Sequence, residues 1–255
     1  MSEYKIITKE IKTKLAKRTI NIYLPSTYDS KTLFPVIYAF DGQNLHDGKY
    51  SLSHDSWEVS QSMERLIKEG KTKGFIVVGI YNSKDRTKEY APSNFKDEMY
   101  KPKFIKMVFK PRYDISFSLL NEAMRVVESE FKVNGERYVM GSSYGGNITL
   151  WTLANMPDKF NGAGIYSIAS EFFASDYLDF VKKSDIGPKH IAYNYMGTAE
   201  DMGSDPVGES YRVNELLKEK GLKIKYVLGE GLTHTEKAWA NYFPDFVLFI
   251  EENNK

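Results

Sequence analysis

The sequence predicts an α/β fold with a mostly parallel central sheet and helices on both faces. Short apolar runs alternate along the chain with amphipathic stretches of helical spacing, which is typical of such folds. Several of the runs are apolar without interruption, as expected for strands that are buried on both faces. A chain of 255 residues suits one domain, which would bury roughly 70–75% of its unfolded surface. We therefore expect a single α/β domain over residues 1–255.

The first part of the chain supplies three strands and one helix. Residues 19–24 (TINIYL) alternate apolar and polar side chains and end before a proline, which indicates an early strand. Residues 35–40 (PVIYAF) and 75–79 (FIVVG) are continuous apolar runs, which favours buried strands. The apolar spacing within residues 58–69 predicts a helix that ends at Gly70.

Residues 82–113 interrupt this rhythm. They are polar, aromatic and basic and contain three prolines, so we expect a long excursion over one end of the sheet. The excursion carries a basic run at Lys101, Lys103, Lys106, Lys110 and Arg112. This run would attract an anionic substrate, or it forms a solvated charged face, as charge runs more often do.

The second half of the chain returns to alternating helices and strands. Helical spacing predicts helices over residues 115–131, 148–156 (the later part of a helix), 207–220 and 239–251. Apolar runs predict strands over residues 138–141, 162–168, 192–197 and 223–228. Gly221 follows the third of these helices in the position of a C-terminal cap.

Composition excludes several classes of protein. The chain has 27% charged residues, a net charge of +1 and no cysteine. This balance gives no indication of a nucleic-acid or membrane-surface partner, and no disulfide or thiolate zinc site can form. No stretch has the ~18 apolar residues of a membrane span, and the N-terminal residues lack the apolar core of a secretory signal. We expect a cytoplasmic protein without a metal or other cofactor, although a leader already removed would give the same appearance.

The most informative motif is G-x-S-x-G at residues 141–145 (GSSYG). The pattern is weak alone, but a predicted strand precedes it and a predicted helix follows it, which is the context of an α/β-hydrolase nucleophile elbow. In such an elbow, Ser143 is the nucleophile and the Tyr144 N–H supplies one half of an oxyanion hole. Ser142, one residue before the apex, is expected to be structural. The alternative is a Gly/Ser-rich turn that caps a structural helix.

A serine nucleophile needs a general base, and two histidines follow it in the chain. His234 lies in a glycine-rich loop after the predicted strand 223–228, so it can reach back over the elbow. His190 precedes the strand 192–197, at the end away from the carboxyl edge where ligands bind in α/β sheets. We therefore choose His234 and expect His190 to be a surface residue. The alternative for His234 is an exposed loop histidine.

The acid should lie between Ser143 and His234, just after a strand. Glu200 and Asp201 both follow the strand 192–197, and either could orient the imidazole. Spacing does not choose between them, and the alternative is a solvated acidic turn. Weaker candidates lie at Asp176, Asp179 and Asp185.

The second oxyanion donor usually comes from the loop after an earlier buried strand. The turn DGQN follows the strand 35–40. We choose the backbone N–H of Gln43, with Asn44 as second choice. The alternative is an ordinary Asp-Gly turn.

These ordered motifs resemble the Putative esterase family of α/β-hydrolases. That family includes esterase D, the feruloyl and acetyl-xylan esterases of carbohydrate esterase family 1, and enterochelin-type siderophore esterases. The resemblance extends from about residue 19 to residue 250 and rests on the segments PVIYAFDGQN, RTKEYAPS, RYVMGSSYGGNITLWTLANMPDKFNGAGIYS, YMGTAED and GLTHTEKAWANYFPDFVLFI. It implies an α/β-hydrolase fold and serine esterase activity, and it favours Glu200 over Asp201. The turn DGQN departs from the H-G-x-G of some relatives.

The resemblance also suggests which ester the protein hydrolyses. An aromatic rim could bind an aryl ester or a sugar ring, although core packing explains most aromatic side chains. We assign substrate binding to Trp239, Tyr90 and Arg86, and expect Arg86 and Glu89 to form an ion pair that holds the excursion. We expect the protein to be a carboxylesterase that hydrolyses small acyl, aryl (feruloyl-like) or siderophore-type esters without a cofactor. The alternatives are an acyltransferase and a non-catalytic binding module on the same scaffold.

Overall fold

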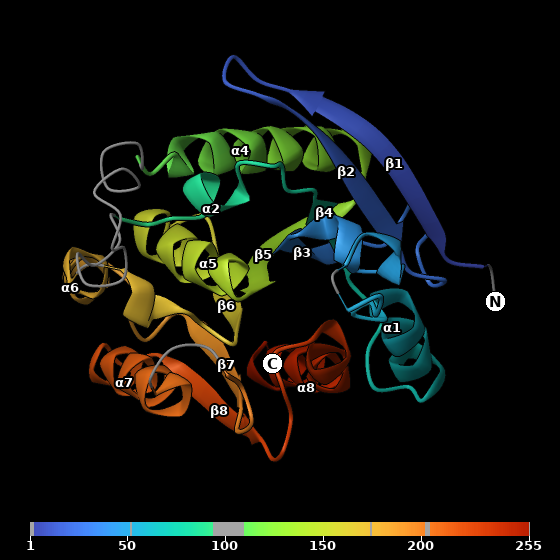
Figure 1. Ribbon diagram of the computed structural model, residues 1–255. Helices are drawn as coiled ribbons and strands as arrows, with labels where there is room; N and C mark the ends of the chain where they lie inside the picture. Colours follow the sequence, from blue (N-terminus) through green and yellow to red (C-terminus); the bar gives the residue numbers. More distant parts are fainter. Residues whose placement is uncertain (1–2, 52, 94–109, 174, 202–204, 255) are drawn as a thin grey trace. The chain divides into compact units, whose positions relative to one another are not determined.

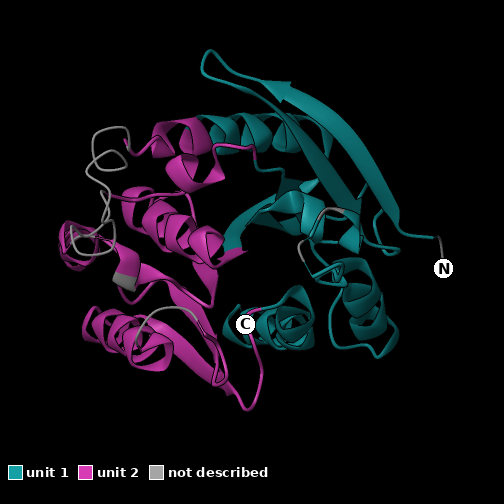
Figure 2. Cartoon of the chain, viewed as in Figure 1, with its two compact units in different colours: residues 1–82, 118–140, 235–255 teal, residues 83–117, 141–234 magenta. Residues whose placement is uncertain are grey.

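The computed structural model describes residues 3–51, 53–93, 110–173, 175–201 and 205–254. The chain divides into two compact units, which Figure 2 distinguishes by colour. Unit 1 consists of residues 1–82, 118–140 and 235–255, and unit 2 of residues 83–117 and 141–234. Each unit contains several of the β-strands that the sequence predicts.

The strands of unit 1 follow the order β1-β2-β4-β3-β5 (Figure 1). They comprise β1 (Lys5–Lys12), β2 (Lys17–Leu24), β3 (Phe34–Phe40), β4 (Ile76–Ile80) and β5 (Val133–Ser142), whose last two residues belong to unit 2. β1 pairs antiparallel with β2, and β2 with β4, whereas β3 pairs parallel with β4 and β5. All five residues of β4 are buried, which explains why its sequence is apolar without alternation.

Helices and short turns complete unit 1. They are η1 (Gly42–Asn44), η2 (Gly48–Tyr50), α1 (Val59–Lys68), α8 (Glu236–Asn253) and the part of α4 (Tyr113–Glu130) from residue 118 onward. α1 packs against α8. The Thr235 side chain accepts a hydrogen bond from the Ala238 N–H and so caps the first turn of α8.

Unit 2 contains a parallel array of three strands in the order β6-β7-β8 (Figure 1). These are β6 (Gly162–Tyr166), β7 (Ile191–Gly197) and β8 (Lys223–Gly229), and every residue of β6 and β7 is buried. The helical elements are α2 (Arg86–Glu89), α5 (Tyr144–Asn155), η4 (Ser170–Phe172), α6 (Asp176–Lys183) and α7 (Pro206–Glu219). α5 packs on β6, and α7 packs on β7 and β8.

The strands and helices expected from the sequence are present, with ends shifted by one to a few residues. The elements that were not predicted are β1, α2, α6 and the short turns η1, η2 and η4. β1 (KIITKEIK) carries four charged residues in eight and has mostly exposed side chains, so it lacks the apolar signal of a buried strand. Its turn to β2 is closed by the Thr13 side chain, which accepts from the Leu15 and Ala16 N–H groups, rather than by a glycine.

The expectation that His190 lies on the surface is wrong. Its side chain is buried, with 1% exposure. The ring Nε2 lies 2.8 Å from the Pro157 carbonyl, and Nδ1 accepts from the Gly187 N–H at 3.0 Å. The tight turn from Gly187 folds the ring back under the chain that leaves α5, so His190 satisfies backbone groups at the N-terminal end of β7.

Among the described residues, no helix has both the length and the apolar character needed to cross a membrane.

His46 is a mostly buried histidine that follows η1. Its ring stacks on Tyr23 with 5.9 Å between ring centroids, and Nδ1 lies 3.3 Å from Ser60 Oγ. Within the described part of the chain, its Nε2 is buried without a hydrogen-bond partner. Burial lowers the pKa of His46 to about 4, because a charged imidazolium would lose its hydration there.

We expect this histidine to make the protein less stable in acid. In the unfolded chain His46 has its ordinary pKa of about 6.5. Between pH 6.5 and 4 the unfolded state therefore binds a proton that the folded state does not, and the free energy of unfolding falls as pH falls. The full effect amounts to up to about 3 kcal/mol. Urea unfolding at a series of pH values measures it.

The matched variants are His46→Asn and His54→Asn. Neither replacement titrates, and His54 is exposed with a φ of 58° that asparagine tolerates. The His46→Asn protein should lose less stability between pH 6.5 and 4 than the wild type, whereas His54→Asn should behave like the wild type. Identical pH dependence in all three proteins would contradict the assignment.

Candidate active site

The turn between β5 and α5 holds Ser143 in an unusual backbone conformation. Its φ is 60° and its ψ is −127°, a combination that L-residues rarely adopt and that costs free energy. The Ser143 N–H donates to the Tyr166 carbonyl of β6 at 3.0 Å, and the side chain is half-buried. This is the strained strand-turn-helix conformation that the motif predicts.

Two glycines allow this turn to be so tight. A Cβ on Gly141 would lie 2.6 Å from the Gly145 carbonyl oxygen, and a Cβ on Gly146 would lie 2.9 Å from the Tyr166 carbonyl oxygen. Any side chain at these positions would push the first turn of α5 away from β5 and β6. The glycines therefore set where Ser143 sits.

Glu200 and His234 are hydrogen-bonded to each other in the same unit as Ser143. Glu200 Oε2 lies 2.8 Å from His234 Nδ1. The other oxygen, Oε1, accepts from the Gly197 N–H at 3.0 Å and from the Ser167 hydroxyl. The Glu200 side chain is fully buried, so these donors offset the cost of desolvating its charge. Asp201, the second choice for the acid, is exposed.

Backbone hydrogen bonds join the turn that carries Glu200 to the loop that carries His234. The Thr198 N–H donates to the Gly229 carbonyl at 2.9 Å, and the Ala199 N–H donates to the Leu232 carbonyl at 3.0 Å. The Gly231 N–H donates to Thr198 Oγ1 at 2.9 Å. The distance between the Glu200 carboxylate and the imidazole is therefore fixed by the backbone of both loops.

The structure brings Glu200 and His234 together, and the contact between His234 and the Ser143 hydroxyl stays a prediction. Catalytic hydrogen bonds are often long in free enzymes and shorten when substrate binds.

Ser167 is a residue of this site that sequence reasoning missed. It is fully buried, has a φ of 47°, and its hydroxyl donates to Glu200. Its N–H donates to the Tyr195 carbonyl of β7 at 2.8 Å. A serine directly after the buried strand β6, at the carboxyl edge of the sheet, was the available signal.

The predicted oxyanion donors lie in different units. In unit 2, Tyr144 is the first residue of α5, and the N–H groups of a first helical turn have no acceptor within the helix. In unit 1, Gln43 lies in η1, and its side-chain oxygen accepts from the Asn82 N–H at 3.1 Å. The Asn44 N–H already donates to the Asp41 carbonyl at 2.9 Å. Gln43 therefore stays the preferred prediction for the second donor.

Arg86, one of the residues assigned to substrate binding, contacts the elbow. Its guanidinium donates to the Ser142 carbonyl at 3.4 Å and lies 5.1 Å from the centroid of the Tyr90 ring and 5.7 Å from that of Tyr144. Tyr90 is buried. In unit 1, Trp239 is also buried, and its ring lies 5.6 Å from that of Trp57.

Part of the predicted excursion lies outside the described residues, including Lys101, Lys103 and Lys106. Lys110 and Arg112 are described and exposed, and Arg112 pairs with Asp114 at 2.9 Å. The predicted pair between Arg86 and Glu89 stays a prediction, while Glu89 accepts from the Ser83 hydroxyl at 2.8 Å. The described residues contain no cluster of three His, Cys, Asp or Glu side chains that could hold a metal ion.

The chain is similar to known esterases over most of its length. A family model described as "Putative esterase" matches residues 13–244. A curated relative from Xylanibacter ruminicola, an endo-1,4-beta-xylanase/feruloyl esterase, is 24% identical over 234 residues. The match covers 87% of this chain but only 28% of that relative.

Two solved structures have a similar fold. An IroE-like serine hydrolase from Shewanella oneidensis has a TM-score of 0.74 and 19% identity, covering 96% of this chain and 80% of that chain. A CE1 ferulic acid esterase from Anaeromyces mucronatus has a TM-score of 0.70 and 18% identity, covering 97% and 91%. These likenesses confirm the predicted α/β-hydrolase fold.

Proposed function

Because the chain belongs to the Putative esterase family, we propose that it is a serine carboxylic ester hydrolase in which Ser143, His234 and Glu200 form the catalytic triad. One observation carries the proposal above the others. A buried carboxylate, held by Ser167 and Gly197, accepts a hydrogen bond from His234 Nδ1 within the unit that also holds the strained serine. A scaffold without chemistry has no physical need for all three features.

The first half-reaction acylates the serine. With its Nδ1–H bonded to Glu200, the neutral imidazole presents an unprotonated Nε2. Nε2 takes the proton of the Ser143 hydroxyl as Oγ attacks the ester carbonyl, and the Tyr144 N–H stabilises the resulting oxyanion. The imidazolium then gives the proton to the leaving alkoxide. The alcohol departs, and the acyl group stays on Ser143.

The second half-reaction releases the acid. A water molecule transfers a proton to His234 Nε2 and attacks the acyl carbon, and the Ser143 oxygen leaves and recovers its proton. In both half-reactions the role of Glu200 is to orient the ring and to stabilise its positive charge. No metal or organic cofactor takes part in this scheme.

The proposed substrates are esters of small acyl, aryl or siderophore-type acids. The curated relative is an endo-1,4-beta-xylanase/feruloyl esterase, and this chain covers 28% of its length. Tyr144 is itself a residue of the elbow, and its half-buried ring lies 6.4 Å from the half-buried Phe172 ring, centroid to centroid. Such a pair of aromatic faces suits an apolar or aryl acyl group.

A fluorophosphonate probe tests the proposed nucleophile. Such a probe reacts with an activated serine, so we expect one label per folded chain, on the peptide that contains residues 141–145. Heat-unfolded protein should not react, because an isolated serine is a poor nucleophile. Labelling at another residue would overturn the assignment of Ser143.

An ester panel tests the reaction itself. The panel comprises p-nitrophenyl esters from acetate to octanoate together with methyl ferulate, with and without an added alcohol. We expect release of the free acid. Predominant formation of a new ester with the added alcohol would instead indicate an acyltransferase, and a folded protein inactive on every ester would count against the hydrolase.

A further inference from the structure

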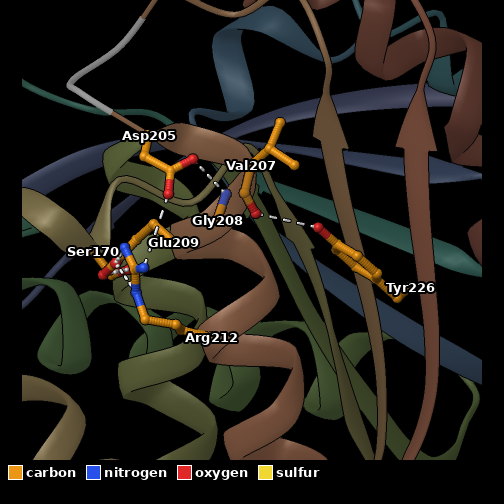
Figure 3. A network of polar contacts seen from close by, with 7 residues as sticks. All are labelled: Ser170, Asp205, Val207, Gly208, Glu209, Arg212 and Tyr226. Atoms are coloured by element: carbon orange, nitrogen blue, oxygen red, sulfur yellow. Dashed lines mark hydrogen bonds and ion pairs between the residues drawn. The ribbon is translucent and has the colours of Figure 1, made fainter.

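A second buried carboxylate lies in unit 2, and the proposed mechanism does not use it. Glu209 is on the first turn of α7 and is only 6% exposed. Its Oε1 accepts from the Ser170 hydroxyl at 2.8 Å, and its Oε2 accepts from Arg212 Nε and Nη2 at 2.8 and 2.5 Å (Figure 3). A carboxylate is costly to bury and persists only where its partners compensate that cost. Ser170 and Arg212 are the partners that compensate this cost for Glu209.

The α7 end of this contact is firmly anchored. Asp205 caps α7 by accepting from the Gly208 N–H at 2.9 Å, and the Tyr226 hydroxyl of β8 donates to the Val207 carbonyl at 3.4 Å (Figure 3). One residue after Glu209, Ser210 is hydrogen-bonded to Asn194 of β7 through its backbone and its side chain. Glu209 is therefore held in place by α7, and its hydrogen bond to Ser170 can position η4, the element that carries Ser170.

Ser170 opens η4, the short turn that brings aromatic rings to the elbow. The turn is closed by the Phe173 N–H, which donates to the Ser170 carbonyl at 3.1 Å. The Phe172 and Phe173 rings lie 6.4 and 5.9 Å from the Tyr144 ring, centroid to centroid. Phe173 is buried, whereas Phe172 and Tyr144, the residue that follows Ser143, are half-buried and keep part of their side-chain surface accessible.

Two serines therefore attach the segment after β6 to the segment after β7. Ser167 binds Glu200, and three residues later Ser170 binds Glu209. The first contact holds the acid of the proposed triad. The second holds the turn that carries Phe172, and nothing in the proposed chemistry requires it.

We propose that the hydrogen bond between Ser170 and Glu209 positions Phe172 as one wall of the acyl site and thereby sets the preference for bulky over small acyl groups. This inference rests on the proposed function. Ser170 and Glu209 are positioning residues, because they act through Phe172 and do not touch the ester. An acetyl group is too small to need this wall, whereas an aryl acyl group gains contact area from it.

The test compares Ser170→Ala with Ser210→Ala. Both variants remove a buried serine hydroxyl from a side-chain hydrogen bond in the same unit, but only Ser170 holds η4. For Ser170→Ala we expect kcat/KM for methyl ferulate to fall about tenfold, mainly through KM, which corresponds to about 1.4 kcal/mol. Its kcat/KM for p-nitrophenyl acetate should stay within about twofold, as should both values in Ser210→Ala.

A double-mutant cycle with Glu209→Ala identifies the partner. If Ser170 acts through Glu209, Ser170→Ala should have little further effect on the ratio of the two kcat/KM values once Glu209 is gone. Arg212 is more than half exposed and tolerates the loss of its carboxylate partner. Equal losses on both esters, or the same shift in Ser210→Ala, would overturn the proposal and indicate only a general loss of stability.

Hydrogen exchange separates failure of this proposal from failure of the proposed function. The Phe173 amide should exchange faster in Ser170→Ala than in the wild type or in Ser210→Ala, whether or not the protein hydrolyses esters. Unchanged exchange would overturn the role of the Ser170 contact. If exchange changes as expected and the wild type hydrolyses no ester, the proposed function fails and the acyl-site role fails with it.

Discussion

Replacing Ser143 with alanine should reduce kcat on any accepted ester by about 10⁵–10⁶-fold. The substitution removes the attacking oxygen and leaves the strained backbone, the Glu200–His234 pair and the glycines of the elbow in place. Because alanine meets the same constraint at a φ of 60°, we expect little change in thermal stability. Steady-state kinetics on the best ester of the panel, together with a melting curve, measure both quantities.

Ser142→Ala is the matched control for this prediction. Ser142 is the preceding residue and is buried, and its backbone carbonyl accepts from Arg86 whatever side chain it carries. Activity should therefore stay within a few-fold of the wild type, because the Ser142 hydroxyl that is removed has no role in the proposed reaction. If Ser142→Ala were inactive and Ser143→Ala active, the nucleophile would be the other serine of the motif.

The parts of the site that could be predicted from sequence are those set by local pattern. The glycines of the elbow lie within five residues of Ser143. Their spacing predicts that the backbone of α5 approaches the neighbouring strands closely, as the structure shows. His234 follows from the chain order of the fold and from the glycine-rich loop around it. Neighbours in sequence constrain these residues directly, so the pattern carries the information.

The parts that could not be predicted depend on contacts between distant segments. Ser167 and Glu200 are 33 residues apart, and only the parallel pairing of β6 with β7 brings them together. His190 was misplaced because nothing nearby in the sequence indicates that Pro157 accepts from its ring. Burial of a polar side chain depends on finding a partner, and a partner elsewhere in the chain leaves no local signal.

The same limit applies to the choice between Glu200 and Asp201. Adjacent residues after a strand point in different directions, and spacing alone did not separate them. In the structure Glu200 is inside and bonded to His234, whereas Asp201 is exposed. This difference makes the two carboxylates suitable for a direct comparison.

Glu200→Gln should reduce kcat by about 10³–10⁴-fold with the fold intact. The glutamine oxygen can still accept from Ser167 and Gly197, which leaves its amide NH₂ facing His234 Nδ1. An NH₂ group donates, so Nδ1 must accept, and the neutral ring then carries its proton on Nε2. An imidazole in that tautomer cannot take the proton of Ser143, and no nearby negative charge stabilises it when it is protonated. Kinetics on the same ester measure the loss.

Asp201→Asn makes the same chemical change one residue away and should keep activity within about twofold, because exposed charges contribute little. Fluorophosphonate labelling of Ser143 gives an independent readout. Labelling should slow in Glu200→Gln in proportion to kcat, since both reactions need the same activated hydroxyl. A slow ester reaction with normal labelling would mean that Glu200 supports substrate binding rather than the base. If Asp201→Asn were the more damaging change, the acid of the triad would be Asp201, and the contact between Glu200 and His234 would be structural.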